Sequence, residues 1–292
     1  MSTALRASLF IALQKLLPAR FLARLVYAAT RSRTVWFKNL LIRGFLRLYA
    51  VDVAEAAAPV PAGYESFNAF FTRALKPAAR PLATDPAAIL SPADGIIQQI
   101  GDIDEDRILQ VKGMDYRLGE LLGSEADGVA AYRNGSFITI YLAPSDYHRV
   151  HMPLAGRVTG MSYVAGELWS VNASTAARVP RLFARNERVI CHCLAPWGPF
   201  AVVLVGALNV GSVSTVWAGE VLPRRGGSTH WDYPGTGSSI ELGRGELLGQ
   251  FNMGSTVIVL LPPGVARWQA GLQAGAPVRM GQMLGQRLAP PP

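Results

Sequence analysis

The sequence predicts an α+β protein in which an amphipathic helical arm precedes a mainly antiparallel, β-rich core. Half of the 292 residues are hydrophobic and 16% are charged, a balance that excludes a disordered chain. The 29 glycines and 20 prolines are frequent turn formers, and they favour short strands over a helical bundle. All of the excess positive charge lies in residues 1–50, which hold nine Lys and Arg residues and no acidic residue.

The arm is predicted to form amphipathic helices, because its apolar residues recur with a period of 3.6. They form three groups: Leu9, Leu13, Leu16 and Leu17 before Pro18; Phe21, Leu22, Leu25 and Val26 beside Arg20 and Arg24; and Phe37, Leu40, Leu41, Phe45 and Leu48 opposite Asn39, Arg43 and Arg47. Recurring charges exclude a membrane-spanning helix and a signal peptide. Apolar side chains outnumber the polar ones that nucleic-acid recognition needs, so we expect no nucleic-acid partner. Helices lying on an anionic membrane surface fit best, and a helical arm packed on the core is the alternative.

We divide the chain into the arm at residues 1–53, a linker rich in Ala, Pro and Gly at 54–65, and a β-rich catalytic domain at 66–292. Runs of β-prone residues separated by turns predict strands at Gly95–Ile100, Ser136–Leu142, Arg157–Tyr163, Val189–Leu194, Ser239–Leu242 and Thr256–Leu261. The stretch between Arg188 and Glu220 has no charge, but glycine and serine interrupt it and valine dominates. We expect a buried β-hairpin there, formed by Ala201–Leu208 and Ser212–Ala218, and not a membrane span.

Two histidines lie three residues apart in the segment Ser145–Pro153. If Ser145 caps a short helix that Pro153 ends, the imidazoles of His148 and His151 face the same side. Paired imidazoles with pKa values near neutrality suit proton transfer, and two structural histidines are the alternative. No second cluster with ligand spacing accompanies them, so we expect no metal.

Three other motifs are ambiguous when each is taken alone. On a strand, the thiols of Cys191 and Cys193 would share one face and His192 the other, which predicts buried free thiols. Asp94, in the turn Ser91–Gly95, is more typical of an aspartate that caps its own backbone. The Gly-Ser-Thr triplet that begins at Gly254 carries little information by itself.

Together these motifs resemble the phosphatidylserine decarboxylase proenzymes of bacteria. The resemblance covers about three quarters of the chain in the family's order, through Phe67–Pro77, Ser91–Gly95, Tyr147–Pro153, Gly166–Asn172, Arg185–Arg188, Val205–Gly211, Gly245–Phe251 and Gly254–Thr256. The family's usual leucine before the Gly-Ser-Thr triplet is methionine here, Met253. This exchange conserves side-chain volume and does not weaken the resemblance.

The resemblance implies a chain that cleaves itself between Gly254 and Ser255, into a β chain of residues 1–254 and an α chain of residues 255–292. It maps a catalytic triad onto Asp94, His151 and Ser255. It also implies that Ser255 becomes a pyruvoyl cofactor, which forms a Schiff base with the substrate amine. His148 is then our candidate for assisting decarboxylation or protonation.

The resemblance further implies a substrate and a location. Phosphatidylserine in an anionic leaflet would be decarboxylated to phosphatidylethanolamine by an enzyme peripheral to the cytoplasmic side of the cell membrane. The α and β chains would form a heterodimer, with further dimerisation left open. Arg73 and Lys76 are candidate partners of the phosphodiester. Because the triad lies outside residues 1–50, we expect their removal to spare self-cleavage.

Three alternatives remain at this point. A membrane-surface serine hydrolase could use the same Asp, His and Ser residues without self-cleavage, and its chain would stay intact. A non-enzymatic membrane adaptor would be unaffected by the loss of Ser255. A pyruvoyl enzyme could also act on another amine, although the basic arm disfavours a soluble amino acid.

Overall fold

The computed structural model describes residues 14, 19–111, 113–124, 126–207, 212–222, 226–235 and 239–288. Its helices are α2 (Ala19–Thr30), α3 (Val35–Leu48), the short 3-10 helix η1 (Val53–Glu55), α4 (Phe67–Phe71), α5 (Leu118–Leu122), α6 (Ala126–Ala130), α7 (Ala173–Ala176) and α8 (Leu182–Arg185). Its strands are β1 (Ala88–Leu90), β2 (Gly95–Asp102), β3 (Arg107–Val111), β4 (Met114–Arg117), β5 (Ser136–Tyr141), β6 (Arg149–His151), β7 (Gly156–Val164), β8 (Arg188–Ala195), β9 (Gly198–Val205), β10 (Val213–Thr215), β11 (Gly219–Val221), β12 (Ser228–Asp232), β13 (Ile240–Leu242), β14 (Leu247–Phe251), β15 (Thr256–Leu261), β16 (Ala266–Trp268), β17 (Pro277–Val278) and β18 (Met283–Arg287). The α+β prediction is confirmed, and the first predicted helical group, Leu9 to Leu17, lies outside the described residues.

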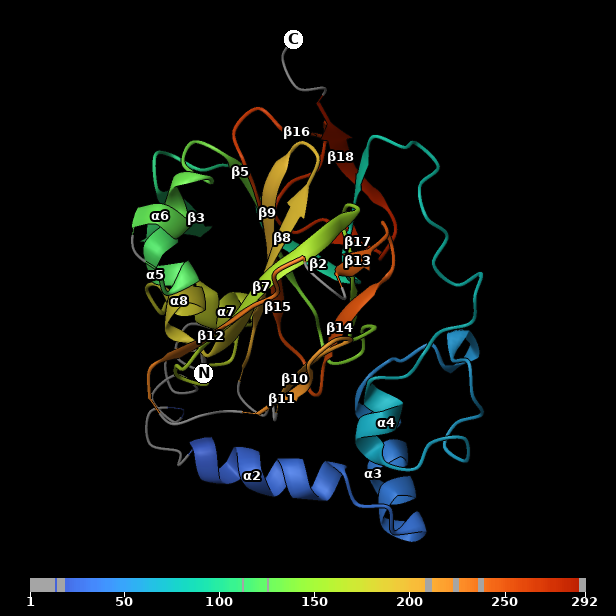
Figure 1. Ribbon diagram of the computed structural model, residues 1–292. Coiled ribbons are helices and arrows are strands. Elements are labelled where there is room, and N and C mark those ends of the chain that lie inside the picture. Colours follow the sequence, from blue (N-terminus) through green and yellow to red (C-terminus); the bar gives the residue numbers. More distant parts are fainter. Residues whose placement is uncertain are drawn as a thin grey trace.

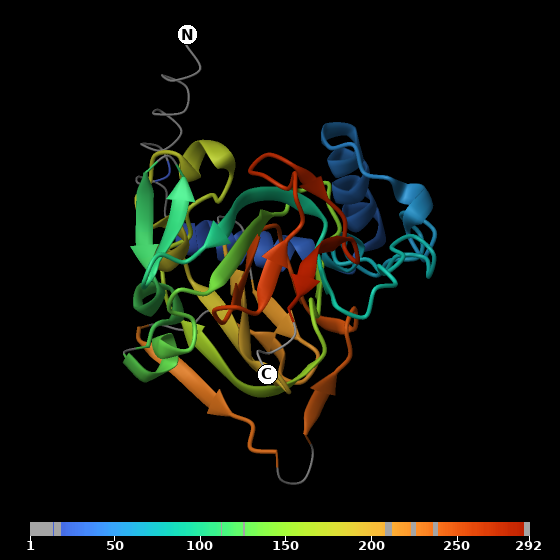
Figure 2. The same cartoon turned by 90° about the horizontal axis from the view of Figure 1, so that it is seen from above.

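The largest sheet has nine strands, in the order β12-β7-β8-β9-β15-β5-β2-β17, with β13 also paired to β7. Its strands pair antiparallel throughout. Strand β15 lies in the middle, between β9 and β5, and all six of its residues are buried. Figures 1 and 2 show this sheet as the centre of the molecule, with the short helices α5 to α8 beside it.

Both faces of the middle of the central sheet are covered, which explains why β9 and β15 are almost entirely apolar. On β15, Val257, Val259 and Leu261 enter one buried cluster, whereas Ile258 and Leu260 enter the cluster on the other face. The strict two-residue alternation of side chains along a strand produces this division. The neighbouring strands β8 and β9 divide their residues in the same way.

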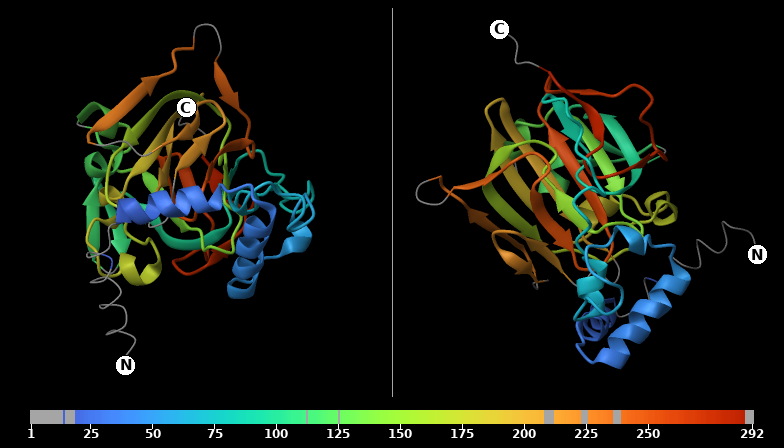
Figure 3. Two further views of the ribbon diagram at one scale, coloured as in Figure 1. Left: turned by 90° about the horizontal axis from the view of Figure 1, so that it is seen from below. Right: turned by 90° about the vertical axis from the view of Figure 1, so that its right-hand side faces the viewer.

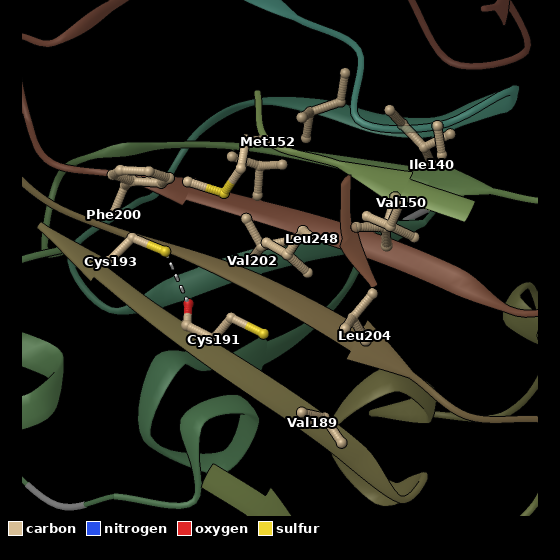
Figure 4. Close-up of a cluster of buried hydrophobic side chains, with 14 of the residues drawn as sticks. Ile140, Val150, Met152, Val189, Cys191, Cys193, Phe200, Val202, Leu204 and Leu248 are labelled. Atoms are coloured by element: carbon tan, nitrogen blue, oxygen red, sulfur yellow. Dashed lines mark hydrogen bonds between the residues drawn. The ribbon is translucent and has the colours of Figure 1, made fainter. Parts of the chain in front are cut away.

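The uncharged stretch forms strands and not a helix, as expected, but its predicted hairpin is wrong. Strand β9 pairs with β8 and β15, whereas β10 belongs to a different sheet, where it pairs with β11 and β14. Cys191 and Cys193 are buried on one face of β8, as predicted (Figure 4). His192 lies on the opposite face, where its Nε2 is 3.0 Å from Ser162 Oγ.

A four-stranded sheet, in the order β11-β10-β14-β6, lies beside the central sheet. The chain leaves β14 at Phe251 and enters β15 at Thr256, so residues 252–255 form the connection between the two sheets. A second small sheet, β1-β18-β16, brings the C-terminal strands against the start of the catalytic domain. The cleavage site predicted at Gly254 and Ser255 therefore lies in a short connection between two strands held in different sheets.

Helices α2 and α3 lie together at one end of the molecule, at the bottom of Figure 1 and in front of the core in the left view of Figure 3. Helix α3 packs on α4 through an aromatic cluster, in which the Phe45 ring lies 5.3 Å from that of Phe67 and 5.9 Å from that of Phe71. The predicted linker contributes to the same cluster through the buried ring of Tyr64. Because removal of residues 1–50 would expose these rings, truncation would disturb the core as well as remove the arm.

The outer sides of these two helices carry exposed apolar residues. The exposed fractions are 58% for Phe21, 69% for Trp36, 59% for Leu40 and 79% for Leu48. No helix among the described residues is long and apolar enough to cross a membrane.

Candidate active site

Ser255 lies at the start of β15, where its backbone carbonyl accepts a hydrogen bond from the Leu142 N–H at 2.9 Å. Its side chain is fully buried. Among the described residues, its Oγ has no hydrogen-bond partner. A buried hydroxyl without a partner is costly. Thr256 Oγ1 is also buried without a partner among the described residues, so it is the preceding glycine, placed against His148, that distinguishes Ser255 as the candidate nucleophile.

Gly254 is in direct contact with a histidine. A Cβ atom added to this glycine would lie 3.2 Å from Cε1 of His148 and 3.6 Å from the Leu142 carbonyl oxygen. Any other residue at this position would have to displace the imidazole by a few tenths of an ångström. The absence of a side chain at Gly254 therefore allows His148 to pack against the peptide unit that precedes Ser255.

His148 is fully buried and its ring stacks on Phe71, with ring centroids 4.0 Å apart. Its Nε2 lies 3.4 Å from the Pro144 carbonyl oxygen. Within the described part of the chain, its Nδ1 has no partner. Burial lowers the pKa of His148 to about 3, so the imidazole is neutral near physiological pH.

His151 is held by hydrogen bonds at both ring nitrogens. Nδ1 lies 2.9 Å from the Gly245 carbonyl oxygen, which can only accept, so Nδ1 carries the proton. Nε2 therefore accepts the hydroxyl proton of Tyr147, at 3.0 Å. Burial lowers the pKa of His151, whereas the Gly245 carbonyl and the charge of Asp94 act in the opposite direction. The result is a neutral imidazole with one fixed tautomer.

Asp94 is bound by Arg80 rather than by His151. The Nε of Arg80 donates to both carboxylate oxygens, at 2.9 and 3.0 Å, and the Met280 N–H donates at 2.8 Å. Arg80 also binds Glu55 at 2.8 Å, and the hydrogen bond to Asp94 is the largest cause of its raised pKa. Asp94 acts on His151 through its charge, because no hydrogen bond joins Asp94, His151 and Ser255 among the described residues.

The predicted helix across Ser145–Pro153 is wrong. Residues Arg149–His151 form the strand β6, which pairs with β14. Pairing with a distant strand supplies the backbone hydrogen bonds that a local helix would otherwise provide. His148 lies just before this strand, against Gly254, whereas His151 points to Tyr147 and Gly245. The two imidazoles thus have different surroundings, and no helical turn relates them.

The segment before Gly254 is also connected to the arm. Asn252 Nδ2 donates to Ser212 Oγ at 2.7 Å. The guanidinium of Arg31, which follows α2, donates to the same hydroxyl at 3.1 Å and forms an ion pair with Glu220. Helix α2 is therefore linked through two side chains to the connection that contains the predicted cleavage site.

Sequence reasoning missed several residues of this site. Arg80, itself paired with Glu55, binds Asp94. The ring of Phe71 stacks on His148, and the hydroxyl of Tyr147 is hydrogen-bonded to His151. Tyr147 and Phe71 had a signal in the sequence, since they lie in segments that carry the family resemblance, whereas Arg80 and Glu55 lie outside those segments. Among the described residues, no group of three or more His, Cys, Asp and Glu side chains gathers as a metal-binding set.

The buried histidines predict a loss of stability in mild acid. Burial lowers the pKa of His148 to about 3 and that of His192 to about 4, from an ordinary value of 6.5. Below pH 6.5 the unfolded chain therefore binds more protons, and each histidine lowers the free energy of unfolding by up to ~1.4 kcal/mol per pH unit. Urea unfolding of an uncut Ser255→Ala chain between pH 7 and pH 5 measures this slope. His192→Gln should remove the contribution of one histidine to this slope. A free energy of unfolding that does not change between pH 7 and pH 5 would contradict the lowered pKa values of these rings.

The fold and the site define a β-rich protein with a Gly-Ser pair whose serine is buried, and with two neutral histidines, at a connection between two sheets. A family model described as phosphatidylserine decarboxylase matches residues 67–286, and a second, described as PSD, matches residues 9–50. The chain is 53% identical to the phosphatidylserine decarboxylase proenzyme of Methylococcus capsulatus, over 97% of this chain and 98% of that protein. It is 52% identical to the protein of the same name from Ectopseudomonas mendocina, over 96% and 99%.

This chain therefore belongs to the phosphatidylserine decarboxylase family and is an enzyme of that family. Its match to these proenzymes extends over nearly the full length of both proteins. The arm is included, since the second family model covers most of it.

Proposed function

We propose that this chain is a proenzyme that cleaves itself between Gly254 and Ser255 and then decarboxylates phosphatidylserine to phosphatidylethanolamine at a membrane surface. The observation that carries the proposal is the buried Oγ of Ser255, which has no partner among the described residues, next to a glycine whose missing side chain leaves room for His148. An exposed nucleophile would be expected of an enzyme that attacks external esters. A buried one is suited to attack on its own chain, which favours self-cleavage over the alternative of a serine hydrolase.

The self-cleavage can be written with all atoms accounted for. The Oγ of Ser255 attacks the carbonyl carbon of Gly254 while a base takes the hydroxyl proton. The C–N bond breaks, the nitrogen of residue 255 gains a proton, and an ester joins Gly254 to the Ser255 side chain. Elimination releases the Gly254 carboxylate and leaves an enamine, which one water hydrolyses to a ketone with loss of ammonia. The ketone is the pyruvoyl group at the start of the α chain.

His151 is the proposed base, with Asp94 acting through its charge. The fixed tautomer of His151 presents a lone pair on Nε2. Burial lowers the pKa of His151, and the Gly245 carbonyl and Asp94 oppose that shift. In the uncut conformation the Tyr147 hydroxyl donates a hydrogen bond to that lone pair. The hydroxyl must therefore move away before Nε2 can take the proton of Ser255. His148, with a pKa of about 3, is the poorer proton acceptor, although it lies against Gly254.

The surroundings of Ser255 fit a pyruvoyl group, because the buried Oγ has no partner among the described residues and no side chain would have to leave. Such a group supplies an electron sink for the electrons released when carbon dioxide leaves. The chain's own residues hold and shield this position. Strands β5 and β9 flank β15, Leu142 holds the Ser255 carbonyl, and His148 lies close enough to assist proton delivery.

The strand pairing supports a lasting heterodimer of the α and β chains. The proposed α chain, residues 255–292, contains β15, β17 and β18. These strands pair with β5 and β9, with β2 and with β1, all of which belong to the proposed β chain. Cleavage at Gly254 therefore leaves every one of these ladders intact, and we expect the two chains to remain together without a covalent link.

The exposed side of the arm is the proposed membrane contact. Trp36 and Leu40 are 69% and 59% exposed on α3, and Arg43 and Arg47 are exposed on the same helix. At helical spacing, residues 36, 40, 43 and 47 share one side, so Leu40 lies with Arg43 and Arg47, and the prediction that placed it opposite them is wrong. A surface that combines apolar side chains with cations is suited to an anionic leaflet, where apolar burial and electrostatic attraction add.

Substitutions on this side of α3 test the membrane contact without opening the aromatic cluster. Trp36→Ser with Leu40→Ser is expected to weaken binding to anionic vesicles at least about 100-fold, since each side chain contributes roughly 1.5 kcal/mol or more of apolar burial. Vesicle co-sedimentation measures the change. Leu109→Ser with Leu194→Ser, two exposed leucines of the β-rich domain, is the matched control. If both pairs bind equally, the arm is not the membrane contact.

The function itself is tested with vesicles that contain phosphatidylserine labelled in its serine carboxyl group. The purified protein is expected to release labelled carbon dioxide and to produce phosphatidylethanolamine. An intact chain that instead hydrolyses lipid esters would favour the serine hydrolase.

A further inference from the structure

Arg73, one of the two candidate phosphodiester partners in the sequence, is a buried cation that takes no part in the proposed self-cleavage. It follows α4 and is only 4% exposed. Its Nη2 reaches the Ser145 carbonyl oxygen at 3.4 Å. Among the described residues, neither its Nε nor its Nη1 has a hydrogen-bond partner. A guanidinium that is buried and mostly unpaired is unfavourable, unless it binds an anion that arrives later.

The neighbouring carboxylates do not neutralise Arg73. Asp94 and Glu55 lie within the range of its charge, but both are held by Arg80. Asp146 accepts the Ala143 N–H at 2.7 Å and is itself raised in pKa by burial. Within the described part of the chain, no carboxylate lies within ion-pair distance of Arg73.

Arg73 lies between the arm and the reacting residues. On one side its guanidinium is 5.4 Å from the ring of Phe70, which belongs to the aromatic cluster under α3. Toward the reacting residues its Nη2 contacts the Ser145 carbonyl, and the carbonyl of the preceding residue, Pro144, lies 3.4 Å from Nε2 of His148. A lipid whose acyl chains lie at the arm and whose amine reaches Ser255 would place the middle of its headgroup near Arg73.

We propose that Arg73 binds the phosphodiester of the lipid substrate. This proposal rests on the proposed function. The substrate has two anionic groups, and the chemistry distinguishes between them. The carboxylate loses its charge when carbon dioxide leaves, so a cation paired with it would stabilise the ground state and slow the reaction. The phosphodiester keeps its charge throughout, and a buried guanidinium can bind it equally well at every stage.

Uniform binding of this kind predicts a separation of kinetic parameters. Arg73→Gln is expected to raise KM for dihexanoyl phosphatidylserine about 10- to 100-fold, the usual loss for a hydrogen bond to a charged group, with kcat within about threefold. Arg73→Lys should recover part of the loss because it keeps the charge. Arg133→Gln is the matched control, since Arg133 is an exposed arginine of the same domain that belongs to no proposed site, and its KM should not change.

Two further measurements separate binding from a structural role. Glycerophosphocholine carries a phosphodiester but neither a carboxylate nor a primary amine, and it should inhibit the processed wild type at least tenfold more strongly than Arg73→Gln. Inhibition by free serine should be equal for both proteins. Arg73→Met should raise the unfolding midpoint, because it removes an unpaired buried charge, and should still raise KM.

The outcomes distinguish a failure of the proposed function from a failure of the Arg73 proposal. A wild-type protein that neither cuts itself nor releases carbon dioxide would overturn the proposed function. If the wild type is active but KM and inhibition by glycerophosphocholine are unchanged in Arg73→Gln, Arg73 is not the phosphodiester site. A change confined to inhibition by serine would assign Arg73 to the carboxylate and would overturn the proposal as well.

Discussion

Ser255→Ala is expected to remain a single chain of 292 residues and to release no carbon dioxide from phosphatidylserine. The wild type should yield a β chain of 254 residues and an α chain of 292 − 254 = 38 residues. Without the Oγ no nucleophile lies beside the Gly254 carbonyl, so neither the ester nor the ketone can form. Mass spectrometry of the purified proteins gives both chain masses, and the α chain should be blocked to amino-terminal sequencing because it begins with a ketone.

Thr256→Val is the matched control for this substitution. Thr256 is the next residue, it is fully buried, and its Oγ1 also has no partner among the described residues. Its replacement removes a hydroxyl from the same environment with little change of shape, and we expect cutting to continue. A fully active Ser255→Ala protein, or an active wild type that stays uncut, would refute the self-processing mechanism.

The second large effect is a division of tasks between the two histidines. His151→Ala and Asp94→Asn are expected to slow self-cleavage by about 10²- to 10⁴-fold, the usual contribution of a general base. His148→Ala should still cut, at least in part, yet decarboxylate poorly. The physical reason is that His151 has a fixed tautomer, and the Gly245 carbonyl and the charge of Asp94 partly offset the lowering of its pKa by burial, whereas burial lowers the pKa of His148 to about 3.

A time course of chain cleavage after synthesis, followed by the decarboxylation assay on the cut fraction, separates these steps. His192→Gln is a suitable control, because His192 is a half-buried histidine on the face of β8 opposite Cys191 and Cys193 and should affect neither step. If His148→Ala blocks cutting while His151→Ala cuts normally, the roles are reversed, in agreement with the contact between His148 and Gly254. If neither substitution matters, the proposed triad is wrong.

Much of the fold follows from local patterns in the sequence. The 3.6-residue period predicts α2 and α3, and runs of β-prone residues predict strands such as β5, β7 and β15. These patterns suffice because the periods of helices and strands are local properties of the chain. Strand pairing is not local, and it explains why the predicted hairpin and the predicted helix are both wrong. Ala201–Leu208 was expected to pair with Ser212–Ala218, but β9 pairs with β8 and β15, and Arg149–His151 became a strand because β14 lies beside it.

The sequence by itself determined which residues could carry chemistry, since the family's motifs place Asp94, His148, His151 and Ser255 in this chain. Only the tertiary structure decided their burial, their ion pairs and their pKa values. Arg80 holds Asp94, Phe71 buries His148, and Arg73 remains without an anion among the described residues. The partners in the first two contacts are 14 and 77 residues apart. A pKa or an ion pair depends on which charges and apolar groups surround a side chain, and the spacing of motifs along the chain does not contain that information.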